Sequence, residues 1–426
     1  MAKEILALQA NNTWVEVDLP PAIKGWSLHQ LDVNNAFLQG DLDEEIYMKI
    51  PPGLARKGES KVFLLNKSIY GLKQASRQWF AKLSSFLLAE GFTKCLCDHS
   101  LFTYHRGSTS IFVLVYVDDI IISGTDDNFI CSLKSRLASH FSIKDLGRLQ
   151  YLLGIEVSRS PKGIFICQRK YVLDILKDSG LTRAHVSSFP MDAHIKLLPT
   201  YAKDLTDPSS FHRLIGRLLY LTVTRPDITY AINYLSQFMK HPRTTHLDAA
   251  HHVLRYLKGT IGHGIFLSSS SVLSLHGYTD SDWAGCPLTR RSTTCYFVSI
   301  GSSPISWKSK KQPTVARSSA EAEYRVMANL TTELQWLRYL FKDLHIPCPL
   351  PITISCDNQA AIHIAQNPVF HERTKHKEID CYFVHGKLMN GLILPKYLPS
   401  ADQLADVFTK PLGAQQFVRS GSPAPT

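Results

Sequence analysis

The stretch Tyr116-Val117-Asp118-Asp119 lies between two apolar runs, residues 111–115 and 120–122. Both runs have the length and β-branched composition of buried strands, so we expect a hairpin with the two aspartates at its tip. Acidic side chains are almost never buried without a partner, and a divalent cation is a natural partner for two adjacent carboxylates. The pattern therefore predicts a metal site, although a surface Asp-Asp turn is the alternative for this motif taken alone.

A third aspartate closes an earlier predicted strand. Residues 26–31 form an alternating stretch, and Asp32 ends it. Two-metal phosphoryl transfer needs carboxylates from separate strands, because one ion lowers the pKa of an attacking 3′-hydroxyl while the other neutralises a leaving pyrophosphate. Asp32, Asp118 and Asp119 together are enough to carry both ions.

The strings around these aspartates resemble those of the copia-type retrotransposon polyproteins. In family order they are LDVNNAFLQGDLDEEIYMKIPPG (31–53), LNKSIYGLKQASRQWF (65–80), YVDDIIISGT (116–125) and LGRLQYLLGIEVSR (146–159). The resemblance covers nearly the whole chain. It implies an RNA-directed DNA polymerase, a reverse transcriptase, whose partners are an RNA template, a DNA primer and dNTPs. It also implies that Asp32, Asp118 and Asp119 bind two Mg²⁺ ions, for which Mn²⁺ is a possible substitute.

Four further residues match family positions for nucleotide and primer binding. Phe37 falls where the family keeps a bulky ring beneath the incoming sugar, and Gln74 resembles the glutamine that touches the templating pair or the nucleotide. Tyr116 opens the YVDD motif, and Gly154 sits in a segment that resembles the primer grip. Ordinary core packing for Phe37 and a strand bulge for Gly154 are the alternatives.

Composition agrees with a nucleic-acid partner. The 426 residues include 47 Lys and Arg against 36 Asp and Glu, a formal net charge of +11, which favours a polyanionic partner but does not separate nucleic acid from an acidic membrane. No apolar run is long enough for a membrane span and no signal peptide is recognisable, so we expect an intracellular protein, in a cytoplasmic particle or the nucleus. The nine cysteines lack paired metal spacing and are interpreted as reduced structural thiols.

The resemblance implies an α+β fold with several domains. We expect a fingers remnant (1–25), a reverse-transcriptase palm of antiparallel sheet and helices (26–186), thumb and connection helices (187–267), a ribonuclease H-like α/β domain (272–412) and a polar tail (413–426). Within the palm, residues 76–91 and 127–140 have the apolar spacing of helices, the first capped by Ser76. Basic residues of the helical segment fit either duplex contacts or solvated faces: Arg213, Arg217, Arg225, Arg243, Arg255 and Lys258.

The last segment carries a second set of acids. Asp280 follows a strand-like approach, Asp357 follows a later strand, and Asp402 stands at the predicted start of a terminal helix. Between them, Ser318 and Glu321 have the spacing of a capping box, which leaves Glu323 to face the sheet and a metal. Asp282, next to Trp283, remains a competing choice with Asp280.

These acids resemble the set of ribonuclease H. The matching strings are TDSDWAG (279–285), SWKSKKQPTVARSSAEAEY (306–324), CDNQAAI (356–362) and LPSADQLADVFTKPL (398–412). The resemblance implies cleavage of the RNA strand of an RNA–DNA hybrid with two Mg²⁺ ions, held by Asp280, Glu323, Asp357 and Asp402. Lys308, Lys310 and Lys311 suit phosphate contacts or a solvated strand edge, and His376 and His385 are interpreted as surface or core residues.

One departure from the family concerns the region before Asp32. The predicted strand at Trp26 follows Pro20 almost at once, and the basic strands that the family carries there are absent. In a reverse transcriptase the Lys and Arg of those fingers neutralise the triphosphate. We therefore expect a truncated or internally deleted copy with an impaired polymerase. The alternative is a catalytically inactive remnant that still binds nucleic acid.

Overall fold

The computed structural model describes residues 25–51, 61–192, 195, 197, 202–367 and 378–411. It divides into two compact units, Met1–Leu149 and Gln150–Thr426, and each is described by itself. The fingers remnant except Gly25, the polar tail and His376 lie outside the described residues. None of the described helices is both long and apolar enough to cross a bilayer.

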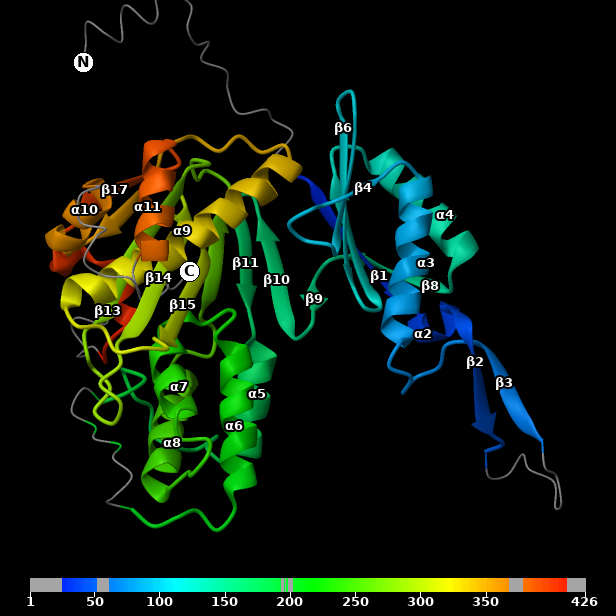
Figure 1. Cartoon of the computed structure of the whole chain (residues 1–426). Helices are drawn as coiled ribbons and strands as arrows, with labels where there is room; N and C mark the ends of the chain where they lie inside the picture. Colours follow the sequence, from blue (N-terminus) through cyan, green and yellow to red (C-terminus); the bar gives the residue numbers. More distant parts are fainter. Residues whose placement is uncertain are drawn as a thin grey trace, which may run out of the picture. The chain divides into compact units, whose positions relative to one another are not determined.

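The first unit is built on a six-stranded antiparallel sheet (Figure 1). Its order is β4 (Thr93–Lys94), β5 (Leu101–Arg106), β6 (Thr109–Tyr116), β7 (Asp119–Gly124), β1 (Ser27–Val33) and β8 (Ile143–Arg148). The predicted hairpin is β6–β7, and the strand predicted before Asp32 is β1. Because β1 pairs with β7, the sheet joins the two aspartate motifs.

Two helices cover this sheet with apolar faces. The helix α3 (Ala75–Ala89) buries Trp79, Leu83 and Leu87, and α4 (Asp127–His140) buries Ile130, Leu133 and Leu137, all in one core cluster. The cap predicted at Ser76 is wrong, because α3 begins at Ala75 and Ser76 lies in its first turn. The short helix α2 (Ala36–Gln39) and a two-stranded sheet, β2 (Asp41–Lys49) with β3 (Val62–Lys67), complete the unit.

The second unit begins with a four-stranded antiparallel sheet. Its order is β12 (Gly264–Ser268), β11 (Gly163–Cys167), β10 (Ile155–Ser160) and β9 (Tyr151–Leu152). Residues 150–186, which the sequence analysis placed in the palm, therefore belong to the compact unit that also holds the C-terminal domain. The pairing of β11 with β12 explains this, because it ties the segment to a strand about a hundred residues later.

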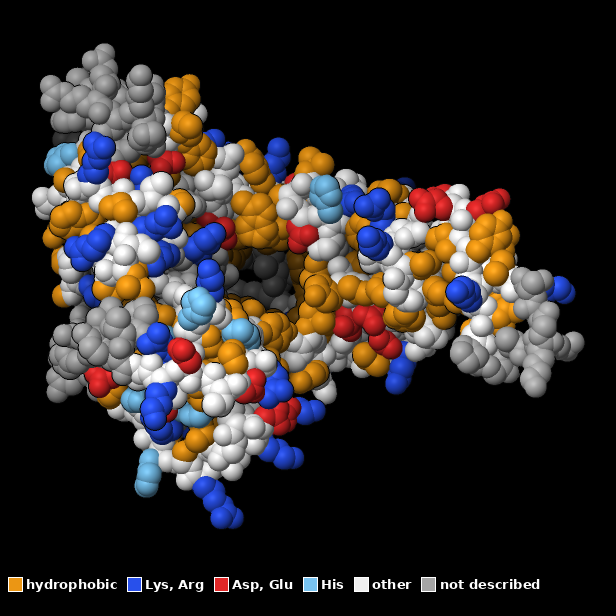
Figure 2. Space-filling view, turned by 60° about the horizontal axis from the view of Figure 1, so that its bottom comes forward, with side chains coloured by type: hydrophobic (Ala, Val, Ile, Leu, Met, Phe, Trp, Pro, Cys, Tyr) orange, Lys and Arg blue, Asp and Glu red, His pale blue; other side chains and the backbone are white. Residues whose placement is uncertain are grey.

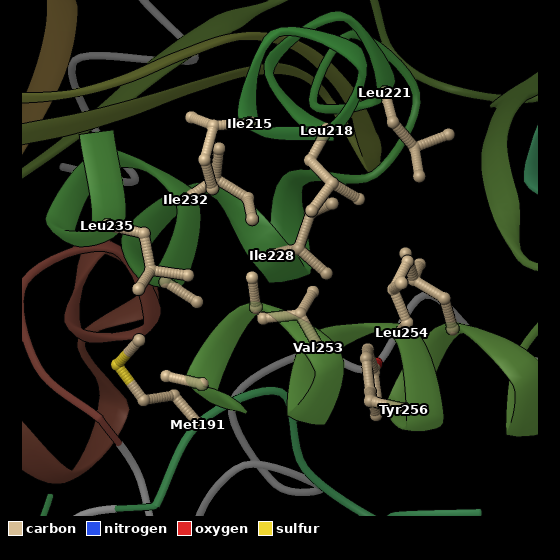
Figure 3. Close-up of a cluster of buried hydrophobic side chains, with 14 of the residues drawn as sticks. Met191, Ile215, Leu218, Leu221, Ile228, Ile232, Leu235, Val253, Leu254 and Tyr256 are labelled. Atoms are coloured by element: carbon tan, nitrogen blue, oxygen red, sulfur yellow. The ribbon is translucent and has the colours of Figure 1, made fainter. Parts of the chain in front are cut away.

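Helices follow, as the sequence predicted. They are α5 (Arg169–Asp178), α6 (Pro208–Leu221), η2 (Pro226–Ile228), α7 (Thr229–Ser236) and α8 (Thr244–Gly259). The start of α6 is capped by Asp207, whose carboxylate accepts from the Ser209 amide. Figure 3 shows Ile215, Leu218, Ile228, Ile232, Leu235 and Val253 pointing into one core between these helices.

A five-stranded sheet forms the rest of the unit. Its order is β15 (Ser303–Lys311), β14 (Thr293–Ile300), β13 (Leu275–Asp282), β16 (Ile352–Cys356) and β17 (Ile393–Tyr397), with parallel pairing on both sides of β16. The long helix α9 (Ser319–Asp343), α10 (Gln359–Gln366) and α11 (Glu378–Met389) share one core with this sheet. The 3₁₀ turns η4 (Ser400–Asp402) and η5 (Leu404–Phe408) follow β17.

Alternating side chains of β14 point to two different cores. Tyr296 and Val298 pack with α9, whereas Cys295 and Phe297 join the core of the helical segment, together with Phe408 of η5. Such alternation is the normal geometry of a strand covered on both faces. The helices of residues 187–267 and the C-terminal domain therefore form one packed body.

Arg225 and Asp227 form a buried ion pair where the sequence predicted a helix break. Arg225 NH2 lies 2.6 Å from Asp227 Oδ2, and both side chains are at most 1% exposed. The Tyr256 hydroxyl donates to the same oxygen at 2.6 Å. The proposed duplex contact of Arg225 is wrong, because its guanidinium is enclosed by these groups.

We predict that Asp227→Ala lowers the free energy of unfolding by about 3–5 kcal/mol, because it leaves the Arg225 charge buried without its partner. Asp178→Ala is the matched control. It removes the partner of Arg217 in a pair whose carboxylate is 64% exposed, and it is expected to cost at most about 1 kcal/mol. Urea unfolding measures both, and equal losses would contradict the prediction.

Two candidate carboxylate sites

The first site is the tip of the β6–β7 hairpin. Tyr116 pairs with Asp119, so Val117 and Asp118 form a two-residue turn, and Asp32 is the direct cross-strand partner of Asp119. Cross-strand partners have Cβ atoms about 4.5–5.5 Å apart. The structure thus brings the three predicted aspartates to one edge, although their carboxylate oxygens do not all approach within 4.8 Å of one another.

A strained turn presents Asp118. Val117 has φ 54°, which is unfavourable for a β-branched residue. Its carbonyl accepts from Trp79 Nε1 at 2.6 Å, and the Val33 amide donates to the Asp118 carbonyl at 2.9 Å. The turn is therefore held from both α3 and β1.

Gln30 is a neighbour of this site that the sequence analysis missed. Its Nε2 donates to Asp119 Oδ1 at 2.9 Å. The sequence could have indicated Gln30, because residues two positions apart on a strand point to the same face and Gln30 lies two positions before Asp32.

Phe37, Gln74 and Tyr116, which were predicted to bind nucleotide or primer, lie in the first unit. The Phe37 ring lies 5.0 Å from the Tyr70 ring, and Gln74 Nε2 lies 3.4 Å from Glu44 Oε2. Tyr116 is 56% exposed. Their roles stay predictions.

Gly154 belongs to the second unit. It forms the β9–β10 turn with Leu153, and both have positive φ, 80° and 49°. A Cβ at Gly154 would meet Tyr220 at 3.7 Å, an ordinary contact, so the backbone conformation rather than space favours glycine. Its predicted contact with a primer is not tested by this geometry.

The second site gathers acids from a strand, a helix and a strand end. Asp280 on β13 and Glu323 on α9 are 6% and 4% exposed. Asp357 directly follows β16, the parallel neighbour of β13. The Ser281 amide donates to Glu323 Oε1 at 2.7 Å, which fixes the helix acid beside the strand.

The pKa values of Asp280 and Glu323 are raised first by burial and then by the charges of neighbouring acids. Burial, and next the charge of Asp406, raise the pKa of Asp280 to about 7. Burial, followed by the charges of Asp280 and Asp357, also raises the pKa of Glu323 well above its ordinary value. Such an arrangement disfavours the ionised form unless a cation is present.

The sequence left two choices of acid, Glu321 or Glu323 on the helix and Asp280 or Asp282 on the strand, and the structure allows each pair to be compared. Glu321 is engaged at the start of α9, where its amide donates to Ser318 and its carboxylate accepts from the Arg317 amide and pairs with Arg325. Asp282 accepts hydrogen bonds from the amide and hydroxyl of Thr293. Both acids have local structural partners, which favours Glu323 and Asp280 for the cluster.

The structure favours a different fourth acid from Asp402, the one predicted from the sequence. Asp402 is exposed on η4 and is not among the main charges that act on Asp280 or Glu323. Asp406, four residues later on η5, is 3% exposed and acts on both. The terminal helix predicted to start at Asp402 does not form, because Asp402 ends the 3₁₀ turn η4 and η5 begins at Leu404. Burial therefore favours Asp406 as the fourth acid, and the metal-binding role of Asp402 stays a prediction. An aspartate flanked by the apolar residues Ala405 and Val407 was the available signal for a buried carboxylate.

Hydrogen bonds fix the segment that carries Asp406. Gln403 Nε2 donates to the Thr279 carbonyl at 2.9 Å. The Phe408 carbonyl accepts from Cys295 Sγ at 2.7 Å and from Ser309 Oγ at 2.8 Å. The Thr409 hydroxyl donates to Asp280 Oδ2. The acid is therefore positioned by the sheet rather than by η5 alone.

The donor set fits a hard divalent cation. Among the described residues, Asp406 Oδ1 is a buried oxygen with no hydrogen-bond partner. Ligand atoms of Glu323, Cys356 and Asp357 lie within 4.8 Å of one another. Burial raises the pKa of the Cys356 thiol to about 12, so the carboxylates rather than the sulfur offer charge. Carboxylate oxygens suit Mg²⁺ or Mn²⁺.

Comparison with known proteins identifies the family. Residues 19–193 match the family model of reverse transcriptase (RNA-dependent DNA polymerase). The chain is 45% identical to the Pol polyprotein from transposon RE1 of Arabidopsis thaliana, over 95% of this chain and 28% of that protein. It is 35% identical to that from transposon TNT 1-94 of Nicotiana tabacum, over 92% of this chain and 30% of that protein. A putative transposon Ty5-1 protein of Saccharomyces cerevisiae is 31% identical over its whole length and 71% of this chain. This chain belongs to the copia-type retrotransposon polyproteins.

The expected α+β fold class and the resemblance to this family are thus confirmed. The copia-type chain spans under a third of the length of the RE1 and TNT 1-94 polyproteins. The first candidate site lies within the matched reverse transcriptase region, and the second lies beyond it.

We predict that the second unit without metal loses stability as pH rises. Asp280 titrates near pH 4 when unfolded and at about 7 when folded, so the folded state binds the extra proton between these values. Stability should therefore fall by at least about 1 kcal/mol from about pH 5 to about pH 8 in EDTA. Thermal unfolding measures this fall, and Asp280→Asn should flatten it. A midpoint that rises with pH would contradict the prediction.

Proposed function

We propose that the second site is a ribonuclease H that cleaves the RNA strand of an RNA–DNA hybrid with two Mg²⁺ ions. This proposal rests on the convergence of four acids, Asp280, Glu323, Asp357 and Asp406. It also rests on Asp406 Oδ1, which is buried and has no hydrogen-bond partner among the described residues. Burial and mutual repulsion raise the pKa values of Asp280 and Glu323, so the ionised forms of these acids are unfavourable unless cations neutralise them. Mn²⁺ is expected to substitute for Mg²⁺.

Bound ions would lower the pKa of an attacking water and neutralise the leaving 3′-oxygen. Residues of this chain hold the metal-binding acids in position. The Thr409 hydroxyl and the Ser281 amide orient Asp280 and Glu323. Lys308 and Lys310, exposed on the edge strand β15, are suited to hold hybrid phosphates.

We also propose that the first unit is the palm of an RNA-directed DNA polymerase, with Asp32, Asp118 and Asp119 as ligands of two ions. The cross-strand pairing of Asp32 with Asp119 supports this assignment. RNA template, DNA primer and dNTPs are its proposed partners. Polymerisation should be impaired, because the sequence passes from Pro20 to Trp26 without the basic strands that neutralise the triphosphate in the family. The reaction would take place inside the cell, in a cytoplasmic particle or in the nucleus.

A second candidate function is nucleic-acid binding without catalysis. It is favoured by the net charge of +11 and by Lys and Arg side chains spread over the surface of the second unit (Figure 2). Lys203, Arg213 and Lys240 are exposed there. Binding that weakens steeply with salt, together with no turnover in either assay below, would support this candidate.

Asp357→Asn and Asp406→Asn are each predicted to lower Mg²⁺-dependent cleavage of a labelled RNA–DNA hybrid by more than about 100-fold, because even outer partners of a metal site change activity by 10–100-fold. Asp402→Asn is the matched control and should cleave like the unmodified chain. Loss of cleavage in Asp402→Asn with retention in Asp406→Asn would reverse the preference for Asp406 over Asp402. Undiminished cleavage by Asp357→Asn would refute the nuclease assignment.

The polymerase proposal predicts weak or absent dNTP incorporation on a poly(rA)–oligo(dT) template with Mg²⁺. The physical reason is a triphosphate that lacks its usual protein counterions. Any residual incorporation should vanish in Asp118→Asn. Robust processive synthesis by the unmodified chain would contradict the predicted impairment.

A further inference from the structure

Lys410 is the basic side chain in contact with the nuclease carboxylates. Its Nζ lies 2.7 Å from Asp406 Oδ2, in a pair whose carboxylate is 4% exposed. Among the ion pairs formed between described residues, this one alone includes Asp280, Glu323, Asp357 or Asp406. Within the described part of the chain, the cluster therefore has one positive side chain in direct contact, that of Lys410.

The two oxygens of Asp406 have different surroundings. Lys410 occupies Oδ2, whereas Oδ1 is buried and has no hydrogen-bond partner among the described residues. Asp406 thus lies between a lysine on one side and an open position on the other. A cation that binds at Oδ1 has the Lys410 ammonium as a positive neighbour on the same carboxylate, and one that binds through both oxygens also competes with the ammonium for Oδ2.

The charge of the cluster acts directly on Lys410. Burial alone would lower the pKa of this lysine, but the hydrogen bond to Asp406 and the charges of Asp280, Asp406 and Asp357 raise it above its ordinary value. The ammonium is therefore held in the field of several carboxylates at once. Without it, the hydrogen bond from the Thr409 hydroxyl would remain to offset the repulsion of Asp280 by Asp406, but the nearby positive charge would be lost.

Displacement of the ammonium is physically easy. The Lys410 side chain is 47% exposed, and a lysine carries its charge on a flexible four-carbon stem. It can therefore move into water, which a buried guanidinium such as Arg225 cannot do. An ammonium that is both close and removable is suited to exchange with a metal ion.

We propose that Lys410 is the counter-cation of the metal-free nuclease site and competes with the divalent ion for Asp406. The inference rests on the proposed metal-dependent nuclease. Lys410 is a positioning residue in this scheme, because it holds Asp406 in place before the metal binds and sets the metal concentration at which the site fills. Lys410 stabilises the metal-free site and lowers the affinity of the site for the divalent ion.

Mn²⁺ affinity provides the test. The full chain is used with Asp118→Asn and Asp119→Asn in every variant, so that the polymerase site does not contribute, and free Mn²⁺ is counted by electron paramagnetic resonance. Lys410→Met should bind Mn²⁺ about tenfold more tightly, because a positive charge next to the ion is removed. Lys410→Arg keeps the charge and should not gain affinity. Lys342→Met, at the exposed end of α9, is the matched control and should match the unmodified chain.

A second measurement uses thermal unfolding without metal. Lys410→Met should lower the midpoint in EDTA by roughly 2–4 °C, and saturating Mn²⁺ should remove most of this difference. If Lys410→Met does not fold, Lys410→Gln replaces it in both measurements. A lysine with only a structural role would leave Mn²⁺ affinity unchanged or weaken it, and either result overturns the proposal.

The failure of this inference differs from the failure of the proposed function. Tighter Mn²⁺ binding by Lys410→Met in a chain that does not cleave hybrid supports the role of Lys410 and refutes the nuclease. Normal cleavage with equal Mn²⁺ affinity in Lys410→Met and the unmodified chain refutes the role of Lys410 alone.

Discussion

Repulsion between neighbouring carboxylates is the constraint on which the functional parts of this molecule depend. Each site places several acids close together, and in the second site the burial of Asp280, Glu323 and Asp406 makes their charges more costly. In the second site this cost appears directly in the raised pKa values of Asp280 and Glu323. A fold can retain such a cluster only if the rest of the structure holds it in place and a cation can enter.

The two units hold their acids in different ways. In the first unit, Asp32 and Asp119 face each other across one pair of strands, and the indole of Trp79 holds the strained Val117 turn. In the second unit, four acids come from four separate elements, and the packing of a whole domain positions them. The Phe408 carbonyl illustrates this, because its hydrogen bonds from Cys295 of β14 and Ser309 of β15 help to fix the segment that carries Asp406.

The helical segment contributes to the same support. Asn233 of α7 donates to the Ser309 hydroxyl, which in turn donates to the Phe408 carbonyl. Val407 and Phe408 also pack into the core of the helices. The helices that sequence analysis assigned to a thumb and connection are therefore part of the framework of the second carboxylate site. Lys410 lies two residues after η5, and its side chain is partly exposed to solvent.

The sequence by itself determined the family, the strands that carry Asp32, Asp119 and Asp280, the hairpin turn that carries Asp118, and the helix that carries Glu323. These follow from local patterns, because apolar periodicity and capping depend on residues a few positions apart. Only the tertiary structure favoured Asp406 over Asp402, enclosed Arg225 with Asp227, and joined residues 150–186 to the C-terminal domain. Each of these depends on contacts between residues that are distant in the chain or on burial that a neighbouring element provides. Local sequence does not encode which acid joins a buried cluster when the other acids of the cluster come from elsewhere in the fold.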